Sequence, residues 1–448
     1  MKKVITYGTY DLFHEGHLNL LKRAKALGDY LIVGVTTDSF DLERGKLNVC
    51  NNVMDRIKAV QETGLADQII IEEYIGQKID DIIKYNVDIF AIGSDWDGKF
   101  DYLKEFCEVI YLPRTQGISS TMLREENNQT INLGIIGTGS IARRFAQETV
   151  FVSSIQVKSA YNPNIEKCEA FCKEFNIPLK ARSFIQLIDN VDAVYIASPP
   201  LTHYDYTKKA LENNKHVICE TPFVLSKTQA IELYNIAKRK HLVLMVALKT
   251  AFCPAFNHLI TLSKSGIIGN IVSIDASVTT LTEENSPKLA YDQAGGSMNE
   301  NACFPLLPIF KLLGTEYSKI NFYSKFKNDV DIYTKAIIEY PNAIASFQVG
   351  LGVKSEGNLI ISGTKGYIYV PAPWWKTDYF EVRYEDQNKN KKYFYTYEGE
   401  GLRYEIKEFI STILNKTRSS NKLSQNEVIK IAEIHDLFLN TPSSITTI

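Results

Sequence analysis

Two histidines near the N-terminus have the type and spacing to act on a phosphate. His14 and His17 are three residues apart, so on a helical turn their rings lie on the same side. An apolar run, Val4–Tyr7, and a Gly8-Thr9 turn precede them, and a helical apolar pattern begins near His17. A strand, a glycine turn and a helix direct backbone N–H groups and a helix dipole at one point, which suits a phosphate. Two imidazoles there would stabilise the charge that develops on the α-phosphate of a triphosphate.

The alternative is an amphipathic helix start with two solvated histidines. It is disfavoured because the chain has only seven histidines in 448 residues. Other residues suit the same ligand. Lys46, Arg56 and Arg114 would offset the charge of a triphosphate, and Gly117 lets a backbone approach it closely. Ser119, Ser120 and Thr121 can cap the next helix, whereas Trp96 offers either a stacking face or core packing.

Alternating elements must position these residues. Apolar strands are expected at 30–36, 68–71, 87–93 and 109–112, and helices at 54–63 and 78–84. This alternation predicts a doubly wound parallel sheet, whose ligands bind beyond the carboxyl ends of the strands. Three polar segments follow such strands directly: Asp38, Ser94-Asp95-Trp96 and Arg114-Thr115.

The bulk properties indicate two or three globular domains in a reducing compartment. The formal net charge is −2, with both signs spread along the chain, which argues against a nucleic-acid or membrane-surface partner. No apolar run approaches the length of a membrane span, and Met1-Lys2-Lys3 enters a strand without a signal-peptide core. The seven cysteines are odd in number and scattered, with no metal-binding pattern. A cytoplasmic location is therefore expected.

A second nucleotide-binding motif follows a polar linker at 127–130. Ile131–Ile136 reads as a strand, and Gly137-Thr138-Gly139-Ser140-Ile141-Ala142 then opens a helix. With a further strand at Val157–Tyr161, this is the dinucleotide fingerprint, with Ala142 in place of the third glycine. The acid that usually holds an NAD ribose is absent, and Asn162 stands there instead. The sequence therefore leaves the choice between NAD and NADP open.

Residues 1–126 resemble the glycerol-3-phosphate cytidylyltransferase family within the H-x-G-H nucleotidyltransferase superfamily. The resemblance rests on Gly8-Thr9-Tyr10-Asp11, His14-Glu15-Gly16-His17, the segment 93–100 and the segment 114–121. It implies that Mg²⁺ and CTP bind here. It assigns CTP to Gly8, Thr9, Tyr10, Asp11, His14, His17, Lys46, Asp95, Trp96, Arg114, Thr115, Gly117, Ile118, Ser119, Ser120 and Thr121.

The same resemblance places Arg56 near the phosphates and Arg44 and Lys78 at a polyol phosphate. One departure concerns the acceptor. An arginine expected in the glycerol-phosphate enzymes is Gly64 here, so the acceptor is free to differ from glycerol 3-phosphate.

Residues 131–448 resemble the Gfo/Idh/MocA oxidoreductases. The fingerprint, Ser198-Pro199-Pro200, Glu220-Thr221-Pro222 and the segment 295–305 carry the resemblance. It implies a Rossmann domain at 131–250, then a domain at 251–448 with a large, mostly antiparallel sheet for substrate binding and oligomerisation. NAD(P) would contact Gly137, Thr138, Gly139, Ser140, Ile141, Asn162, Ser198, His203, Glu220 and Thr221.

The catalytic positions depart from that family. Its usual Glu-Lys-Pro is Glu220-Thr221-Pro222 here, its aspartate aligns with Glu300, and its histidine or tyrosine with Phe304. A ketone that takes hydride also needs a proton or a positive hydrogen bond at its oxygen. Glu300 could deliver a proton, and Lys249, after an apolar strand, could supply the missing cation or be an ordinary surface lysine.

The two halves fit one hypothesis: a bifunctional enzyme that makes a CDP-activated polyol for a bacterial surface polymer. A sugar phosphate would be reduced to a polyol phosphate, which then takes a cytidylyl group from CTP. Two alternatives remain: a second half that binds dinucleotide without turnover, and a first half that uses ATP. Both resembled families imply a homo-oligomer.

Overall fold

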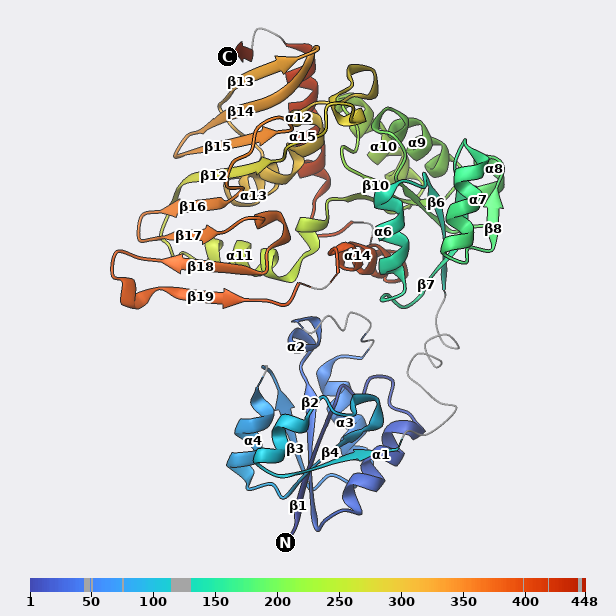
Figure 1. Ribbon diagram of the computed structural model, residues 1–448, viewed down its shortest axis with the longest axis vertical. Coiled ribbons are helices and arrows are strands. Elements are labelled where there is room, and N and C mark those ends of the chain that lie inside the picture. The colour runs from blue at the N-terminus through green and yellow to red at the C-terminus, as the bar shows by residue number, and fades with distance from the viewer. Residues whose placement is uncertain are drawn as a thin grey trace. The chain divides into compact units, whose positions relative to one another are not determined.

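The computed structural model describes residues 1–43, 49, 51–74, 76–113, 130–397, 399–417, 419–441 and 445–448. The chain divides into two compact units, Met1–Thr130 and Ile131–Ile448 (Figure 1).

The first unit is built on a parallel sheet with the strand order β3-β2-β1-β4-β5. The sheet is covered on both faces, because neighbouring residues of β1 enter different cores: Val4 packs with Leu21 of α1, and Ile5 packs with Ile82 of α4. The elements are β1 (Lys3–Gly8), α1 (Glu15–Lys25), β2 (Tyr30–Thr36), α2 (Asp38–Glu43), α3 (Val53–Glu62), β3 (Gln68–Glu72), α4 (Gln77–Tyr85), β4 (Ile89–Gly93), η1 (Ser94–Trp96), η2 (Asp101–Glu105) and β5 (Glu108–Leu112). The doubly wound architecture is thus confirmed.

The second unit begins with another parallel sheet, of order β11-β10-β9-β6-β7-β8. The strand order reverses at β6, because β7 and β8 lie on one side of it and β9, β10 and β11 on the other. The fingerprint turn follows β6, so it lies at the carboxyl edge of the sheet at this reversal, where such folds bind ligands. Its elements are β6 (Ile131–Ile136), α6 (Ser140–Thr149), β7 (Ile155–Tyr161), α7 (Ile165–Glu174), β8 (Leu179–Ala181), α8 (Phe184–Ile188), β9 (Ala193–Ile196), η3 (Pro200–Thr202), α9 (His203–Glu212), β10 (His216–Glu220), α10 (Lys227–Arg239) and β11 (Leu244–Ala247).

A large mixed sheet follows in the same unit, of order β19-β18-β17-β16-β12-β15-β14-β13-β20. Most of its neighbours are antiparallel, and the pairs β12–β15 and β13–β20 are parallel. The fold class expected from the sequence is therefore confirmed. The strands are β12 (Ile271–Thr279), β13 (Lys319–Lys327), β14 (Val330–Tyr340), β15 (Ala343–Gly350), β16 (Leu359–Gly363), β17 (Tyr367–Val370), β18 (Tyr379–Arg383), β19 (Lys391–Phe394) and β20 (Ile445–Thr447).

Further helices of the second unit precede, separate or follow the strands of this sheet. They are η4 (Lys249–Phe252), α11 (Pro254–Lys264), η5 (Pro287–Leu289), η6 (Tyr291–Gln293), α12 (Ser297–Asn301), α13 (Cys303–Leu313), η7 (Trp374–Lys376), η8 (Gln387–Lys389), α14 (Leu402–Leu414) and α15 (Gln425–Asn440). The last two return to the start of the unit: α14 packs on α6 and α15 on α10. A buried ion pair joins α14 to α6, with Nε of Arg403 2.6 Å from a carboxylate oxygen of Glu148. The Rossmann layer is therefore completed by the end of the chain.

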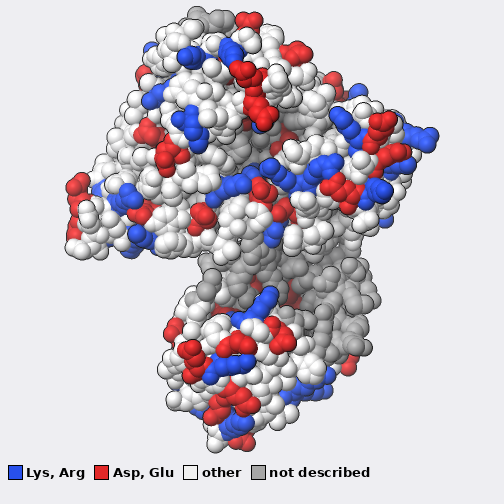
Figure 2. Space-filling model, in the orientation of Figure 1, with Lys and Arg blue, Asp and Glu red and all other residues white. Residues whose placement is uncertain are grey.

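Charged side chains of both signs are interspersed over the visible surface of each unit (Figure 2). Among the described residues, no helix is long and apolar enough to cross a membrane.

Candidate active sites

The two histidines stack at the entrance of α1. His14 is the N-cap residue, and its Nδ1 accepts a hydrogen bond from the Gly16 N–H at 3.0 Å. The ring centroids of His14 and His17 are 3.9 Å apart, with 21° between their planes. Because Nδ1 of His14 is an acceptor, the proton of the neutral ring is on Nε2, which makes Nε2 a donor. The structure thus brings both imidazoles together beside a helix N-terminus, as an anionic ligand requires.

The loop before α1 is held in an unusual backbone conformation. Tyr10 and Leu12 have φ angles of 55° and 47°. Tyr10 is only 1% exposed, and its ring meets that of His17 edge-on, with 5.5 Å between centroids. Gly8 is restricted by the same ring, because a Cβ there would lie 2.9 Å from Tyr10. Tyr10 therefore packs under the histidines and positions them.

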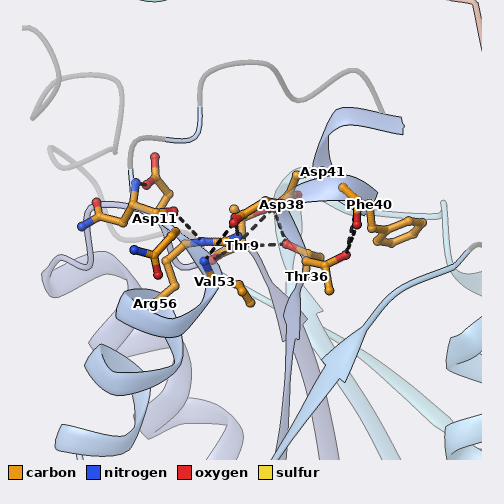
Figure 3. Close-up of polar contacts among 12 residues, drawn as sticks. Thr9, Asp11, Thr36, Asp38, Phe40, Asp41, Val53 and Arg56 are labelled. Carbon is orange, nitrogen blue, oxygen red and sulfur yellow. Dashed lines mark hydrogen bonds and ion pairs between the residues drawn. The ribbon is translucent and has the colours of Figure 1, made fainter. Parts of the chain in front are cut away.

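Arg56 lies inside the protein, where it joins three loops (Figure 3). Its side chain is completely buried. The guanidinium donates to the Thr9 carbonyl at 2.8 Å and to the Asn51 carbonyl at 3.0 Å, and it pairs with Asp38 and with Asp41 at 3.2 Å. The resemblance places Arg56 near the nucleotide phosphates, and this stays a prediction. Among the described residues, the hydrogen bonds of its guanidinium all go to protein oxygens, which supports a positioning role.

Asp41 is the partner that connects Arg56 to the glycine turn. Its carboxylate accepts from Thr9 Oγ1 at 3.1 Å and from Thr36 Oγ1 at 2.6 Å. Asp11 holds a neighbouring segment, since its carboxylate accepts the Asn51 N–H at 2.8 Å. Thr9 and Asp11, both predicted to bind CTP, are thus parts of one buried hydrogen-bonded cluster.

Lys78, predicted at the polyol phosphate, is 9% exposed and forms an ion pair with Glu72, which is 1% exposed. Its Nζ lies 4.6 Å from the centroid of the Tyr7 ring and 5.5 Å from that of Phe100. A cation–π contact and a buried carboxylate fix this ammonium near the carboxyl edge of the sheet. Contact with a substrate phosphate stays a prediction.

Trp96 ends η1 and is 43% exposed, with Lys99 Nζ 5.2 Å from its ring centroid. This exposure suits stacking better than core packing. Asp95 lies in the same short helix. The other residues predicted to bind CTP or the polyol phosphate lie outside the described residues: Arg44, Lys46, Arg114, Thr115, Gly117, Ile118, Ser119, Ser120 and Thr121.

The dinucleotide turn has the geometry that its sequence predicts. Gly137 has a φ of 94°, and a Cβ there would lie 2.4 Å from the Ala197 carbonyl. Gly139 caps α6, and a Cβ on it would meet nothing within 4 Å, so space remains where the helix begins. Gly139 and Ser140 are exposed and Ile141 is half-buried. Backbone N–H groups at this open helix N-terminus fit a dinucleotide pyrophosphate.

Two side chains connect the loops around that turn. Asn162 donates to Thr138 Oγ1 at 2.8 Å, which fixes the end of β7 against the turn. His203 is 1% exposed, and its two ring nitrogens lie 2.8 Å from the carbonyls of Ser198 and Pro222. Burial lowers the pKa of His203. Its role is to join the β9 and β10 loops that would border the nicotinamide.

The predicted catalytic positions of the second unit divide into two groups. Thr221 lies beside the Cys303 thiol. Burial raises the pKa of this thiol to about 12, and the negative charges of Glu220 and Glu300 raise it as well. Glu300 is 2.6 Å from Lys288 Nζ. Burial raises the pKa of Glu220 to about 7, and the Tyr195 hydroxyl opposes this by donating to its carboxylate. Cys303 is thus a neighbour of Thr221 and lies within electrostatic range of Glu300.

Lys249 belongs to the other group. Its Nζ donates to the Glu400 carbonyl at 3.0 Å, and its positive charge lowers the pKa of Glu220 by electrostatic attraction. Burial, and then the charge of Lys376, lowers the pKa of Lys249. The ammonium of Lys249 thus contacts Glu400, and its role as the missing cation stays a prediction.

Several residues that hold these sites carry no motif. Asp41 lies in α2 and Glu72 ends β3, and their partners Arg56 and Lys78 belong to the next helix along the chain in each case. Asp331 accepts from the Ser297 hydroxyl at 2.5 Å and from the Met298 N–H at 3.0 Å, which fixes the helix that carries Glu300. Only the isolated position of Asp331 at the start of a strand pattern could have indicated it.

Comparison with known proteins separates the two units. Residues 5–126 match the cytidylyltransferase-like family model, and residues 131–248 match the model of the oxidoreductase family with an NAD-binding Rossmann fold. Glycerol-3-phosphate cytidylyltransferase of Bacillus spizizenii is 56% identical over 127 residues, which cover 28% of this chain and 97% of that protein.

The second unit has more distant relatives. Trans-1,2-dihydrobenzene-1,2-diol dehydrogenase of Xenopus laevis is 25% identical over 321 residues, which cover 68% of this chain and 95% of that protein. The fold is shared with KijD10, a 3-ketoreductase from Actinomadura kijaniata solved with NADP and TDP-benzene. The TM-score is 0.64 at 20% identity, over 71% of this chain and 98% of that one.

A parallel sheet whose glycine turn leads into a stacked histidine pair defines a nucleotidyltransferase, and the second fingerprint defines a dinucleotide-binding oxidoreductase domain. The chain belongs through its first unit to the glycerol-3-phosphate cytidylyltransferase family, and its second unit is homologous to Gfo/Idh/MocA oxidoreductases.

Proposed function

We propose that this chain makes a CDP-activated polyol in two reactions. The second unit reduces a ketose phosphate to a polyol phosphate with NADH or NADPH. The first unit then transfers a cytidylyl group from CTP to that phosphate and releases pyrophosphate. The observation that carries the transferase assignment is the stacked pair His14 and His17 at the N-terminus of α1. The matching relatives support both enzyme classes.

The transfer reaction follows from the position of the imidazoles. An oxygen of the acceptor phosphate attacks the α-phosphorus of Mg²⁺-bound CTP, and the bond from that phosphorus to the bridging oxygen breaks as pyrophosphate leaves. Negative charge grows on the oxygens around the α-phosphorus during this exchange. Donors from His14 and His17, with the N–H groups at the start of α1, stabilise that charge.

The reduction needs a hydride and a proton. Reduced nicotinamide supplies the hydride when it is bound on the Gly137–Ser140 turn. Glu300 would relay a proton to the carbonyl oxygen from the Lys288 ammonium, and Thr221 would hold that oxygen with a hydrogen bond. Lys288, paired with Glu300 at 2.6 Å, adds positive charge beside it.

The deciding experiment uses the full chain with CTP, Mg²⁺, each reduced cofactor and a panel of ketose phosphates, with the nucleotide product identified by mass. We expect a CDP-polyol only when the reduced cofactor is present. The polyol phosphate, added directly, should react without it. Pyrophosphate release with the four nucleoside triphosphates tests the choice of CTP over ATP.

A second candidate function is a unit that binds dinucleotide as a sensor or assembly module. It is favoured by Thr221, which stands beside a thiol and supplies no cation where the related oxidoreductases carry lysine. Cofactor binding without oxidation of NADH or NADPH by any ketose phosphate would support this candidate and exclude the reductase.

A further inference from the structure

Three cationic side chains surround one carboxylate in the second unit. The distances to Oε2 of Glu400 are 2.9 Å from Lys376 Nζ, 3.8 Å from Lys249 Nζ and 3.8 Å from a guanidinium nitrogen of Arg144. We call Arg144, Lys249, Lys376 and Glu400 the Glu400 cluster. Three positive charges and one negative charge leave a net charge of +2.

The cluster is assembled by segments that are far apart in the chain and held firmly. Arg144 is on α6, Lys249 begins η4, Lys376 ends η7, and Glu400 precedes α14. The Glu400 N–H donates to Glu148 at 3.1 Å, and the Glu400 carbonyl accepts from the Tyr397 hydroxyl at 3.1 Å. The backbone beside the cluster is therefore fixed before any ligand binds.

The excess charge is partly desolvated. The side chain of Lys249 is only 14% exposed, while those of Lys376 and Arg144 are 34% and 53% exposed. Burial and the neighbouring Lys376 lower the pKa of Lys249, and Lys376 lowers the pKa of Glu400. Cations that repel each other in a half-buried site are stabilised by an anion.

Two further acids face Lys249 from its surroundings, and neither removes the excess. Glu405 is fully buried, and burial together with the charge of Glu220 raises its pKa well above the ordinary range. Burial also raises the pKa of Glu220, to about 7. Arg403 is already neutralised by Glu148. The Glu400 cluster therefore keeps three cations around one carboxylate, and the two nearby acids are less readily ionised than exposed carboxyl groups.

We propose that the Glu400 cluster binds the phosphate group of the substrate of the second unit. This rests on the proposed reduction of a phosphorylated sugar, and it names the residues that select the phosphorylated form. A phosphomonoester dianion matches the charge, and Arg144 can hold two of its oxygens in a forked contact. Lys249 follows β11 as Thr221 follows β10, and Glu220 pairs with Ala247 in the sheet. The cluster therefore borders the carboxyl edge where the carbonyl would react.

The test titrates inorganic phosphate into the full chain by calorimetry. Lys249→Met with Lys376→Met removes two cations from the cluster. Lys180→Met with Lys208→Met is the matched control, because each of these lysines pairs with a single carboxylate in the same unit. Binding of phosphate by the first unit is common to all samples, and unchanged binding of NADH or NADPH verifies that the second unit of each variant is folded.

We expect the cluster variant to lose the second-unit phosphate site, with an affinity at least tenfold weaker, and the control to match the parent chain. Arg144→Met, at a half-exposed position, should weaken binding severalfold. Equal phosphate binding by the parent and the cluster variant would overturn the proposal. Turnover is measured separately. If the parent chain oxidises no cofactor, the proposed reduction fails, while the titration still decides whether the anion site exists.

Discussion

His14 and His435 show how surroundings decide what an imidazole does. His14 stands at a helix entrance, where one nitrogen is held by the backbone and the other is a donor. His435 is fully buried in α15, and within the described part of the chain neither of its nitrogens has a hydrogen-bond partner. Burial lowers the pKa of His435 to about 4. His14 can donate a hydrogen bond to a ligand, whereas His435 makes the stability of the protein sensitive to acid.

His435→Leu should make the second unit less sensitive to acid. The folded pKa of about 4 lies below the ordinary value of 6.5, so the unfolded chain takes up the proton first as the pH falls. Stability is full above pH 6.5 and decreases towards pH 4, by about 2 kcal/mol at pH 5. Unfolding midpoints at pH 7 and pH 5 would measure this. If the unfolding midpoint changed by the same amount between pH 7 and pH 5 in the parent chain and in the variant, the expectation would be contradicted.

Single residues also show which contacts could be predicted from the sequence and which could not. The pair His14 and His17 and the glycines of both turns were predictable, because their spacing reflects one local turn. The role of Arg56 was not, since its partners Asp38 and Asp41 are ordinary acids whose approach depends on the folded loops. The contacts of Lys249 were not predictable for the same reason: it donates to the carbonyl of Glu400, which lies 151 residues further along the chain.

At the scale of elements, Arg56 holds together the turn after β1, the start of α2 and the segment before α3. Arg56→Met should leave Asp41 buried without its cation and lower the stability of the first unit by about 3–5 kcal/mol. The thermal transition of the full chain that shifts when CTP is added would report this loss. Adding Asp41→Asn should recover part of the loss. If activity fell with no change in that transition, Arg56 would instead contact the nucleotide directly.

Regular strands were predicted best among the elements, and β2 (Tyr30–Thr36) was predicted to the residue. Its continuous apolar run is typical of a strand buried on both faces. The helix α13 gave no such signal, because Pro305 and Pro308 stand in a segment that is apolar all round. Strands β13, β18 and β19 also lacked a prediction, since their charged residues obscure the alternation.

At the scale of the molecule, two compact units predict separable activities. His17→Ala should lower the rate of cytidylyl transfer by about 10²–10³-fold through the loss of a transition-state donor. Binding of NADH and NADPH by the second unit should be unchanged, as followed by the fluorescence of the reduced cofactor. Gly139→Asp is the reciprocal variant, because a carboxylate at the start of α6 would repel the pyrophosphate. A transferase defect in Gly139→Asp would show that the two activities are coupled.

The return of α14 and α15 to the Rossmann layer has a consequence for biosynthesis. The first unit can collapse as soon as its own residues have left the ribosome. The dinucleotide-binding layer cannot fold so early, because α6 and α10 are not covered until α14 and α15 have emerged. The Glu148 carboxylate also has no Arg403 to pair with until a segment 255 residues later has been made. A nascent chain that stalls near its end would therefore expose apolar helix faces, and we expect it to be a substrate for chaperones and quality-control proteases.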